Sequence, residues 1–281
     1  MKFNRAVAAL LSVSAALSLT ACGGGTASTN ASSNASDASA STGEKTYTVG
    51  TRGTVAAYSY VDDSNNLTGY DIEILREIDR RLPDVAFEFQ TMDLSSCLVA
   101  LEAGQIDLIA NQLMHNDERD LKRLFDFIPY GYAVSRLVVR SDENGISTLD
   151  DLKGKTMALT PTAESTRAIR EFNETADPKI NIVNFDGGSA ETLSQVATGQ
   201  ADATTGYKPS VENSDYELKV VGDPITAVPV YFILRQDDEA EALVKEIDDT
   251  LQEMIDDGTV SSLSEQFLGE DVLQSIDSAA K

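Results

Sequence analysis

Histidine, cysteine and tryptophan are scarce in this sequence, which contains one His, two Cys and no Trp. A zinc site needs several imidazole or thiolate ligands, and neither CxxC nor HExxH occurs. The nucleophile motif GxSxG and the phosphate-binding motif GxxxxGK[ST] are also missing. These absences make metalloenzymes, serine hydrolases and nucleotidases poor candidates, and we expect neither a metal nor a cofactor.

Basic residues are also few, because 22 Lys and Arg stand against 46 Asp and Glu, giving a formal net charge of −24. A chain of this charge is repelled by nucleic acid, so we expect no nucleic-acid partner. The acidic residues are spread along the sequence without long blocks, which is typical of a solvated surface.

The N-terminal segment has the layout of an export signal. Lys2 and Arg5 precede an apolar run, residues 6–21, that serines and a threonine interrupt. A membrane-spanning helix needs about 18 or more apolar residues, so spanning is the weaker interpretation. The run ends at Leu19-Thr20-Ala21-Cys22, which resembles the lipobox of bacterial lipoproteins. The alternative is ordinary cleavage beside an incidental cysteine.

The lipobox resemblance implies that a signal peptide, residues 1–21, is removed and that Cys22 carries lipid at the outer face of the cell membrane. A single lipid chain anchors a protein only marginally, so the resemblance implies more than one. Residues 22–45 contain small and polar residues without a large apolar side chain, and this composition predicts a flexible linker. Only Cys97 is then left, which excludes an internal disulfide and suggests a small buried apolar residue.

After the linker, the pattern of apolar residues predicts a βαβ unit and hence a parallel sheet. Residues 46–50 alternate as a strand, and residues 53–69 read as irregular. Asp71 is expected to cap a helix that Pro83 ends. Its apolar residues at helical spacing are Ile74, Leu75, Ile78 and Leu82. Residues 85–89 alternate as the next strand.

Two similar stretches within the sequence suggest two lobes of related architecture. LVALEAGQIDLIA at 98–110 is similar to LSQVATGQADATT at 193–205, and each predicts a short helix, a glycine, Gln-x-Asp and a strand. Ligands of open α/β sheets bind beyond the carboxyl ends of the strands, so the loops after these strands should face a cleft. The extended stretches 136–140 and 228–234 are the expected hinges. A helical stripe ending at Gly258 predicts core packing by Leu243, Ile247, Leu251, Met254 and Ile255.

Several stretches together resemble the bacterial extracytoplasmic solute-binding proteins that deliver polar amino acids to ABC transporters. They follow the order of the family over nearly the whole chain after the linker. The stretches are LTGYDIEIL (67–75), GQIDLIANQ (104–112), NDER (116–119), FDFIPY (125–130), STLDDLKGK (147–155) and DDGTVSSLSEQFLGED (256–271). The IANQ stretch followed by ER is most similar to the cystine-binding branch.

The resemblance implies an α/β, two-lobed periplasmic-binding-protein fold of type II, in which each lobe is a sheet flanked by helices and two hinge crossovers join them. Lobe 1 would comprise residues 46–136 plus 230–281, and lobe 2 residues 137–229. The expected function is capture of an amino acid or related anion by hinge closure, without catalysis. The expected partners are the small solute and an ABC transporter permease, and the expected state is a lipid-anchored monomer.

The family pattern also places candidate ligand-binding residues. Arg119 matches the carboxylate-binding Arg, whose planar fork suits bidentate pairing; the alternative is a surface Arg among acidic neighbours. Asn111, Gln112 and Met114 lie on a loop that offers backbone groups, with packing as the alternative for Met114. Leu94 is expected to form a wall of the site or to be core.

In the second lobe, Thr160 and Thr162 precede a helix that begins near Ala163, where amides and hydroxyls can hold an anion. The alternative for each is simple capping of that helix.

Two candidate positions depart from the family. The expected ammonium-binding Asp is Tyr207 here, and a phenol offers a hydrogen bond or a ring face but no charge. Arg52 occupies a position where relatives carry Asp or Glu, so the cleft should prefer a ligand with an additional negative group or without an α-ammonium. The alternative is that Arg52 points outward to the acidic surface. His115 is expected on the solvated rim.

Two other classes of function are weighed. An enzyme similar to cyclohexadienyl dehydratase would need a positioned general acid, and Tyr207 stands where an Asp would be. A solute sensor would report occupancy to a signalling partner. Product formation and recovery of the membrane partner would distinguish these from a transport protein.

Overall fold

The computed structural model describes residues 45–115, 124–125 and 128–275. The predicted signal peptide, the linker, Cys22 and Arg119 lie outside these ranges. Within them, no helix combines the length and apolar character needed to cross a membrane.

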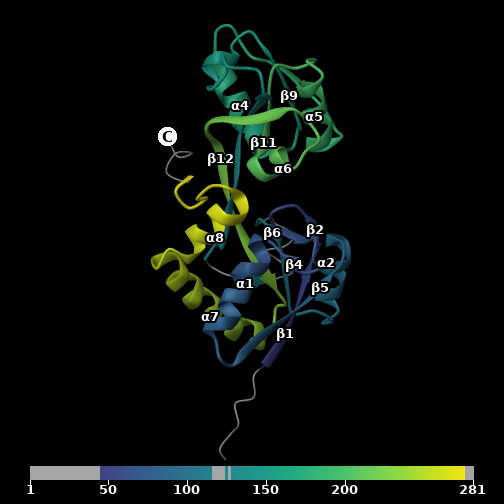
Figure 1. Cartoon of the computed structure of the whole chain (residues 1–281), viewed down its shortest axis with the longest axis vertical. Coiled ribbons are helices and arrows are strands. Elements are labelled where there is room, and N and C mark those ends of the chain that lie inside the picture. Colours follow the sequence, from purple (N-terminus) through teal and green to yellow (C-terminus); the bar gives the residue numbers. More distant parts are fainter. Residues whose placement is uncertain (1–44, 116–123, 126–127, 276–281) are drawn as a thin grey trace, which may run out of the picture. The chain divides into compact units, whose positions relative to one another are not determined.

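A mixed sheet of seven strands extends through the described chain (Figure 1). Its order is β11-β8-β12-β6-β1-β5, and β7 also pairs with β12. The strands are β1 (Lys45–Thr51), β5 (Val85–Thr91), β6 (Leu108–Leu113), β7 (Leu124–Phe125), β8 (Gly131–Arg140), β11 (Thr204–Tyr207) and β12 (Leu218–Leu234). Helix α1 (Tyr70–Arg81) connects β1 to β5, and these two strands are parallel. The predicted βαβ unit is therefore confirmed.

Two details of this region differ from the predictions. Residues 53–69 are not irregular, because they form an antiparallel meander of β2 (Thr54–Val55), β3 (Ser59–Val61) and β4 (Leu67–Thr68). Asp71 is not the cap of α1. The N-cap is Gly69, with no side-chain hydrogen bond, and Asp71 is fully buried within the first turn.

The extended stretches predicted as hinges belong to β8 and β12, which pair with each other in antiparallel fashion. One end of β12 pairs with β6, and β8 pairs with β11. The register between β8 and β12 shifts between Val221 and Thr226. These two long strands therefore connect the part of the sheet built on β1, β5 and β6 to the part that contains β11.

The segment between β8 and β12 contains a second helix and strand layer. Its elements are a 3-10 turn at Asp150–Leu152, β9 (Thr156–Leu159), α4 (Glu164–Thr175), β10 (Asn181–Asn184), α5 (Gly188–Ala197) and α6 (Lys208–Glu212). Strands β9 and β10 are parallel, and a single bridge joins Met157 to Ala203, just before β11. A type II fold of two helix-flanked sheets joined by two crossover strands results.

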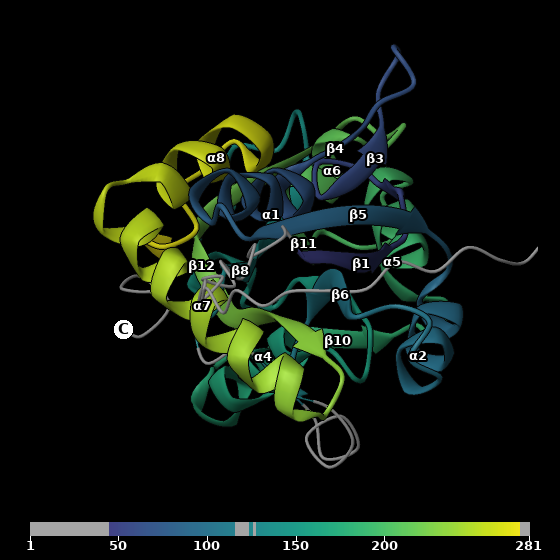
Figure 2. The ribbon, with the colours of Figure 1, turned by 90° about the horizontal axis from the view of Figure 1, so that it is seen from below.

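Helices cover both faces of the β1, β5 and β6 region. Alternate residues of a strand point to opposite faces. Leu108 of β6 packs with the buried side chains of α1 and α7 (Asp238–Asp256), whereas Ile109 packs with Cys97 of α2 (Leu94–Glu102). Figure 2 shows α1, α7 and α8 (Thr259–Leu268) grouped together, and these three helices contact one another.

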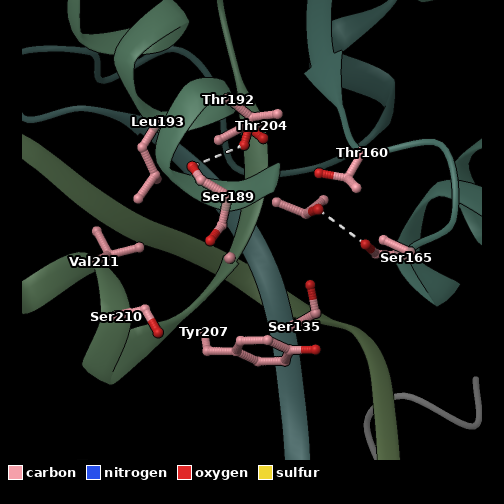
Figure 3. Close-up of a pocket in the computed structure, with 13 residues that line it drawn as sticks. Ser135, Thr160, Ser165, Ser189, Thr192, Leu193, Thr204, Tyr207, Ser210 and Val211 are labelled. Atoms are coloured by element: carbon pink, nitrogen blue, oxygen red, sulfur yellow. Dashed lines mark hydrogen bonds between the residues drawn. The ribbon is translucent and has the colours of Figure 1, made fainter. Parts of the chain in front are cut away.

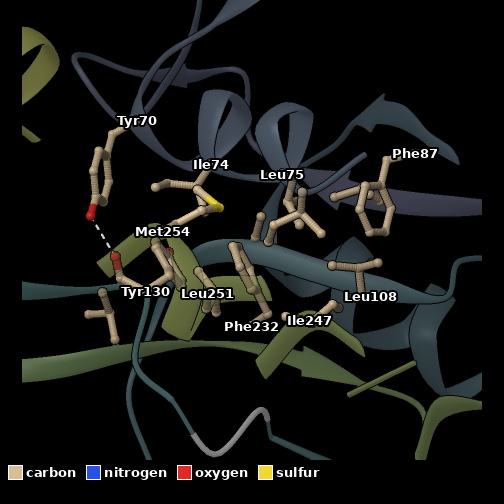
Figure 4. Packing of buried hydrophobic residues seen from close by; sticks show 14 of the residues in the cluster. Tyr70, Ile74, Leu75, Phe87, Leu108, Tyr130, Phe232, Ile247, Leu251 and Met254 are labelled. Carbon is tan, nitrogen blue, oxygen red and sulfur yellow. Dashed lines mark hydrogen bonds between the residues drawn. The ribbon is translucent and has the colours of Figure 1, made fainter. Parts of the chain in front are cut away.

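The main core lies under α1 and α7 (Figure 4). Most of the predicted stripe is buried there, namely Leu243, Ile247, Leu251 and Met254, while Ile255 is only partly buried. The Tyr130 and Phe232 rings stack on each other with centroids 4.1 Å apart. Burial of apolar side chains of this size is the main stabilising contribution of such a core.

The two similar stretches correspond to one structural unit that occurs twice. The glycine after α2 and the glycine after α5 are both left-handed, with φ of 67° and 74°. The Asp of Gln-x-Asp then binds the neighbouring parallel strand. Asp107 Oδ2 accepts from the Thr48 amide at 2.7 Å, and Asp202 Oδ2 accepts from the Thr156 amide at 2.8 Å. The Asp of each repeat therefore anchors a helix–strand connection.

We expect Asp202→Ala to lower the free energy of unfolding by about 1–3 kcal/mol, because the Thr156 amide would lose its acceptor. Urea unfolding followed by circular dichroism measures this change. Gln200→Ala is the control, since Gln200 is exposed and its loss should change stability by less than about 0.5 kcal/mol. Equal destabilisation by the two substitutions would contradict this role for Asp202.

Candidate ligand-binding cavities

Asn111, near the end of β6, is a buried structural residue. Its Oδ1 accepts a hydrogen bond from the Arg52 amide at 3.0 Å, and its Nδ2 lies 3.7 Å from Cys97 Sγ. Only 2 % of Asn111 is exposed. Cys97 is a free, fully buried thiol, and burial raises its pKa, so its prediction as a small core residue is confirmed. Asn111 therefore fixes the backbone that carries Arg52.

Gln112 follows in a left-handed conformation, with φ of 49°, which a non-glycine residue adopts only when its surroundings hold it. Its amide donates to the Tyr130 hydroxyl at 3.0 Å, and its Nε2 donates to Asp71 Oδ2. The Tyr130 hydroxyl donates to Asp71 Oδ1 at 3.1 Å. A buried network of three side chains thus fixes the turn of the chain after β6.

Asp71 is the carboxyl group of this network, and it has no solvent exposure. Burial raises the pKa of Asp71 to about 7, against the opposing effects of the Tyr130 and Gln112 hydrogen bonds and the Arg52 charge. Burial also holds the pKa of the Tyr130 hydroxyl well above its usual value. Asp71 is therefore the ionisable group of this region that titrates near neutral pH.

Two cavities adjoin each other. The larger of the two has a volume of about 350 Å³, and Gln112 of this network is part of its lining. It is lined by Arg52, Val55, Tyr58, Asn111, Gln112, Met114, Tyr132, Ala133, Ser189, Tyr207, Ser210 and Val230. Among the described residues, the lining contains one cation and no carboxylate. Arg52 Nε is buried and has no hydrogen-bond partner within the described residues. Arg52 is therefore not directed outward to the acidic surface, the alternative considered from sequence.

A smaller cavity, of about 90 Å³, adjoins the larger one, and the two share Ser189, Tyr207 and Ser210 (Figure 3). As far as the chain is described, its lining has nine hydroxyl-bearing residues and no charged residue. The lining is Ser135, Thr160, Ala163, Ser165, Ser189, Thr192, Leu193, Thr204, Thr205, Gly206, Tyr207, Ser210 and Val211. The helices α4, α5 and α6 all begin at this cavity.

Most of the residues predicted from sequence lie on these cavities. The larger cavity brings together Arg52, Asn111, Gln112, Met114 and Tyr207, and Thr160 lies on the smaller one. Arg119 lies outside the described residues.

Two predicted residues do not line either cavity. Thr162 is exposed, and Leu94, the first residue of α2, packs partly buried beside the Cys97 cluster, as its core alternative stated. Neither threonine supplies the predicted cap, because α4 has no side-chain N-cap. His115 is exposed as expected, and its ring lies 4.6 Å from that of Tyr231.

Several lining residues were not found from the sequence, among them Tyr58, Tyr132, Ser135, Ser189 and Ser210. For three of them, the sequence pattern contained information that could have identified them. Tyr132 and Ser135 lie on the crossover strand β8, and Ser189 is the second residue of the helix of the second repeat. Tyr58 had none, because its segment read as irregular.

Residues 47–270 match the family model of bacterial extracellular solute-binding proteins, family 3. The chain belongs to this family. Among curated relatives, the L-cystine-binding protein TcyK of Bacillus subtilis is 34% identical over 90% of this chain and 92% of its own length. The L-cystine-binding protein TcyJ of the same organism is 34% identical over 98% of both chains.

Solved structures of this family have the same fold. The probable amino-acid ABC transporter extracellular-binding protein ytmK from Bacillus subtilis superposes with a TM-score of 0.70 at 34% identity, covering 81% of this chain and 99% of that one. The unliganded, open L-cystine solute receptor of Neisseria gonorrhoeae gives a TM-score of 0.64 at 30% identity, covering 82% and 95%. The two-lobed fold predicted from the sequence is confirmed.

Proposed function

We propose that this solute-binding protein captures an amino acid that carries an additional anionic group and delivers it to the permease of an ABC importer. One observation carries the proposal, namely that Arg52 lines the larger cavity with a buried, unpaired Nε while no carboxylate of the described residues lines it. A buried guanidinium nitrogen that makes no hydrogen bond is costly. An anionic group on the ligand would supply the missing partner.

The relatives support the class of ligand and partner. TcyK and TcyJ are named for L-cystine, which carries two carboxylates, and the ytmK protein is named for an amino-acid ABC transporter. The proposed lobes are residues 46–136 with 230–281, and residues 137–229, which close about β8 and β12. Arg119 and Thr160 remain proposed carboxylate-binding residues. We further propose that the protein is a monomer and that lipid on Cys22 keeps it near its permease.

The cavity chemistry favours binding over catalysis. The titratable residues that line the larger cavity are Arg52 and three tyrosines. Burial raises the pKa values of Tyr58, Tyr132 and Tyr207 further above their ordinary value. Phenols with raised pKa values are poor general bases at neutral pH, so these lining residues offer no acid–base pair.

Calorimetry with the mature protein tests the proposal. The panel contains L-cystine, L-glutamate, L-cysteate, L-glutamine, L-arginine and succinate. We expect binding of amino acids with an additional acidic group, and weak or no binding of L-arginine. Tight binding of L-arginine or L-glutamine that Arg52→Ala leaves unchanged would overturn the proposed preference. No binding by any member would overturn amino acid capture itself.

Tyr207 allows a complementary prediction, because it stands where the family places an anion for the ammonium group. Tyr207→Asp would add that anion to a cavity that has none. We expect the substitution to strengthen binding of L-glutamine by about tenfold or more, as one charge-assisted hydrogen bond is worth about 1.5–3 kcal/mol. Tyr207→Phe is the matched control, since it removes the hydroxyl without adding charge. Equal effects of Asp and Phe would contradict the prediction.

A further inference from the structure

The smaller cavity differs from the larger one in having only neutral hydroxyl groups. We infer that it is a subsite for a second oxyanion of the ligand, a carboxylate or a sulfonate, held at the N-termini of α4 and α5. This inference deepens the proposed function and rests on it. It also goes beyond the anion contact expected from sequence at Thr160, since most of the cavity lies between α5 and the strands β8 and β11.

No side chain of the described residues caps the first amides of the two long helices that begin at the cavity; α1 and α8 also lack a side-chain cap, whereas α2 and α7 have one. Helices α2 and α7 are capped by Asp93 and Asp237, whose carboxylates accept from the third amide of each helix. Helices α4 and α5 have no side-chain N-cap. The first amides of a helix have no acceptor within the helix, and the helix dipole makes this end favourable for an anion. Two uncapped N-termini thus open on one small space.

An independent observation is Ser135, a buried residue that belongs to β8 and not to either helix. Ser135 is only 5% exposed, and no hydrogen bond of its side chain occurs within the described part of the chain. In Figure 3 its hydroxyl points into the space bounded by Thr160 and Ser165. The residue is enclosed, yet its hydroxyl is open to the cavity and can donate a hydrogen bond to a ligand that enters it.

Hydroxyl groups near Ser135 also have hydrogens that can be donated to a ligand. Ser165 Oγ and Thr205 Oγ1 lie 2.9 Å apart. Only one of them can donate to the other, so the second hydrogen is available to a ligand. Thr192 already donates to the Ser189 carbonyl at 3.1 Å, which leaves the Ser189 hydroxyl itself for the cavity. Several donors and no fixed negative charge suit an oxyanion better than a cation.

Three acidic residues lie near these helix N-termini, and none of them lines the cavity; Asp186, just before the N-cap of α5, is exposed. Glu164 is exposed and pairs with Arg167 at 2.6 Å. Glu191 accepts from the Gly187 amide at 2.8 Å. The space of about 90 Å³ admits a group of a few heavy atoms. The body of the ligand would therefore lie in the larger cavity, with one oxyanion reaching past Ser189 into the smaller one.

Ser189→Asp tests the inference, because an Asp in the first turn of α5 should not weaken the helix but would place a negative charge at the subsite. Ser194→Asp is the matched control: it adds the same charge to the same helix at a residue that lines neither cavity. Calorimetry with L-cystine, L-glutamate and L-cysteate, preceded by thermal melting of each variant, is the measurement.

We expect Ser189→Asp to weaken binding of these diacids at least tenfold while Ser194→Asp changes it less than threefold, with the melting temperature of Ser189→Asp unchanged or higher. Ser135→Ala should weaken diacid binding in the same direction without adding charge. If the diacids bind Ser189→Asp and Ser194→Asp equally well, the subsite is overturned while amino acid capture stands. If wild-type protein binds no amino acid of the panel, the proposed function is overturned and the subsite with it.

Discussion

Arg52→Met is expected to weaken binding of an acidic amino acid by about ten- to a hundredfold while it makes the ligand-free protein more stable. A hydrogen bond to a charged group contributes about 1.5–3 kcal/mol, which corresponds to this loss of affinity. The ligand-free protein should gain about 1 kcal/mol or more, because the substitution removes a buried Nε that has no partner. Opposite effects on binding and on stability are characteristic of a residue placed for a ligand.

Calorimetry with L-glutamate and urea unfolding without ligand measure the two effects. Arg170→Met is the matched control, since Arg170 is an exposed cation of α4 and its replacement should change neither quantity appreciably. An Arg52→Met protein with unchanged affinity, or one that is less stable without ligand, would show that Arg52 is a structural cation. The proposed preference for an anionic ligand would then lose its main support.

Local patterns were sufficient for most of the fold. The βαβ unit, the apolar stripe of α7 and both Gln-x-Asp units depend on residues close in sequence, and each is confirmed. The meander at residues 54–68 was not predicted because its strands have only two or three residues each, too few to show a period. The meander forms because of its contacts with other segments, which the local sequence does not reveal.

Asp71 shows why a residue's role can depend on partners that sequence reasoning cannot see. A carboxylate before a helical stripe is a good cap by local rules. In the structure its partners are Gln112 and Tyr130, which are 41 and 59 residues away. The cavity residues show the same difference. Arg52, Gln112 and Tyr207 were found by comparison with the family pattern, whereas Tyr58 reaches the larger cavity only through tertiary packing.

Asp71 also provides the prediction with the largest expected effect on stability. Its pKa is about 7 in the folded protein and about 3.9 in an unfolded chain. Between about pH 4 and pH 7 the folded state retains a proton that the unfolded state has released. Unfolding therefore releases a proton, and the contribution of Asp71 to stability falls as pH rises through this window and is constant above it.

Asp71→Asn removes this titration and leaves a side chain of the same shape. We expect the variant to gain stability relative to wild type as pH rises from about 4.5 to 7.5, by at most about 1.4 kcal/mol per pH unit. Urea unfolding at several pH values gives the difference curve, in which the other carboxyl groups cancel. Asp151→Asn is the control, because hydrogen bonds lower the pKa of Asp151 and its difference curve should be flat above pH 5. A flat curve for Asp71→Asn would show that Asp71 titrates normally.

The same ionisation should reach the ligand through Arg52. The positive charge of Arg52 lowers the pKa of Asp71, so the Asp71 carboxylate must in turn offset part of the positive potential that an anionic ligand meets. We therefore expect the affinity for L-glutamate to decrease as pH rises through about 7, and Asp71→Asn to abolish that decrease. In Arg52→Met the pKa of Asp71 should move still higher, which shifts the window of falling stability toward alkaline pH. The pH dependence of affinity and the change in the pKa of Asp71 have one cause, namely the electrostatic interaction between the buried Asp71 carboxyl group and the Arg52 cation of the cavity.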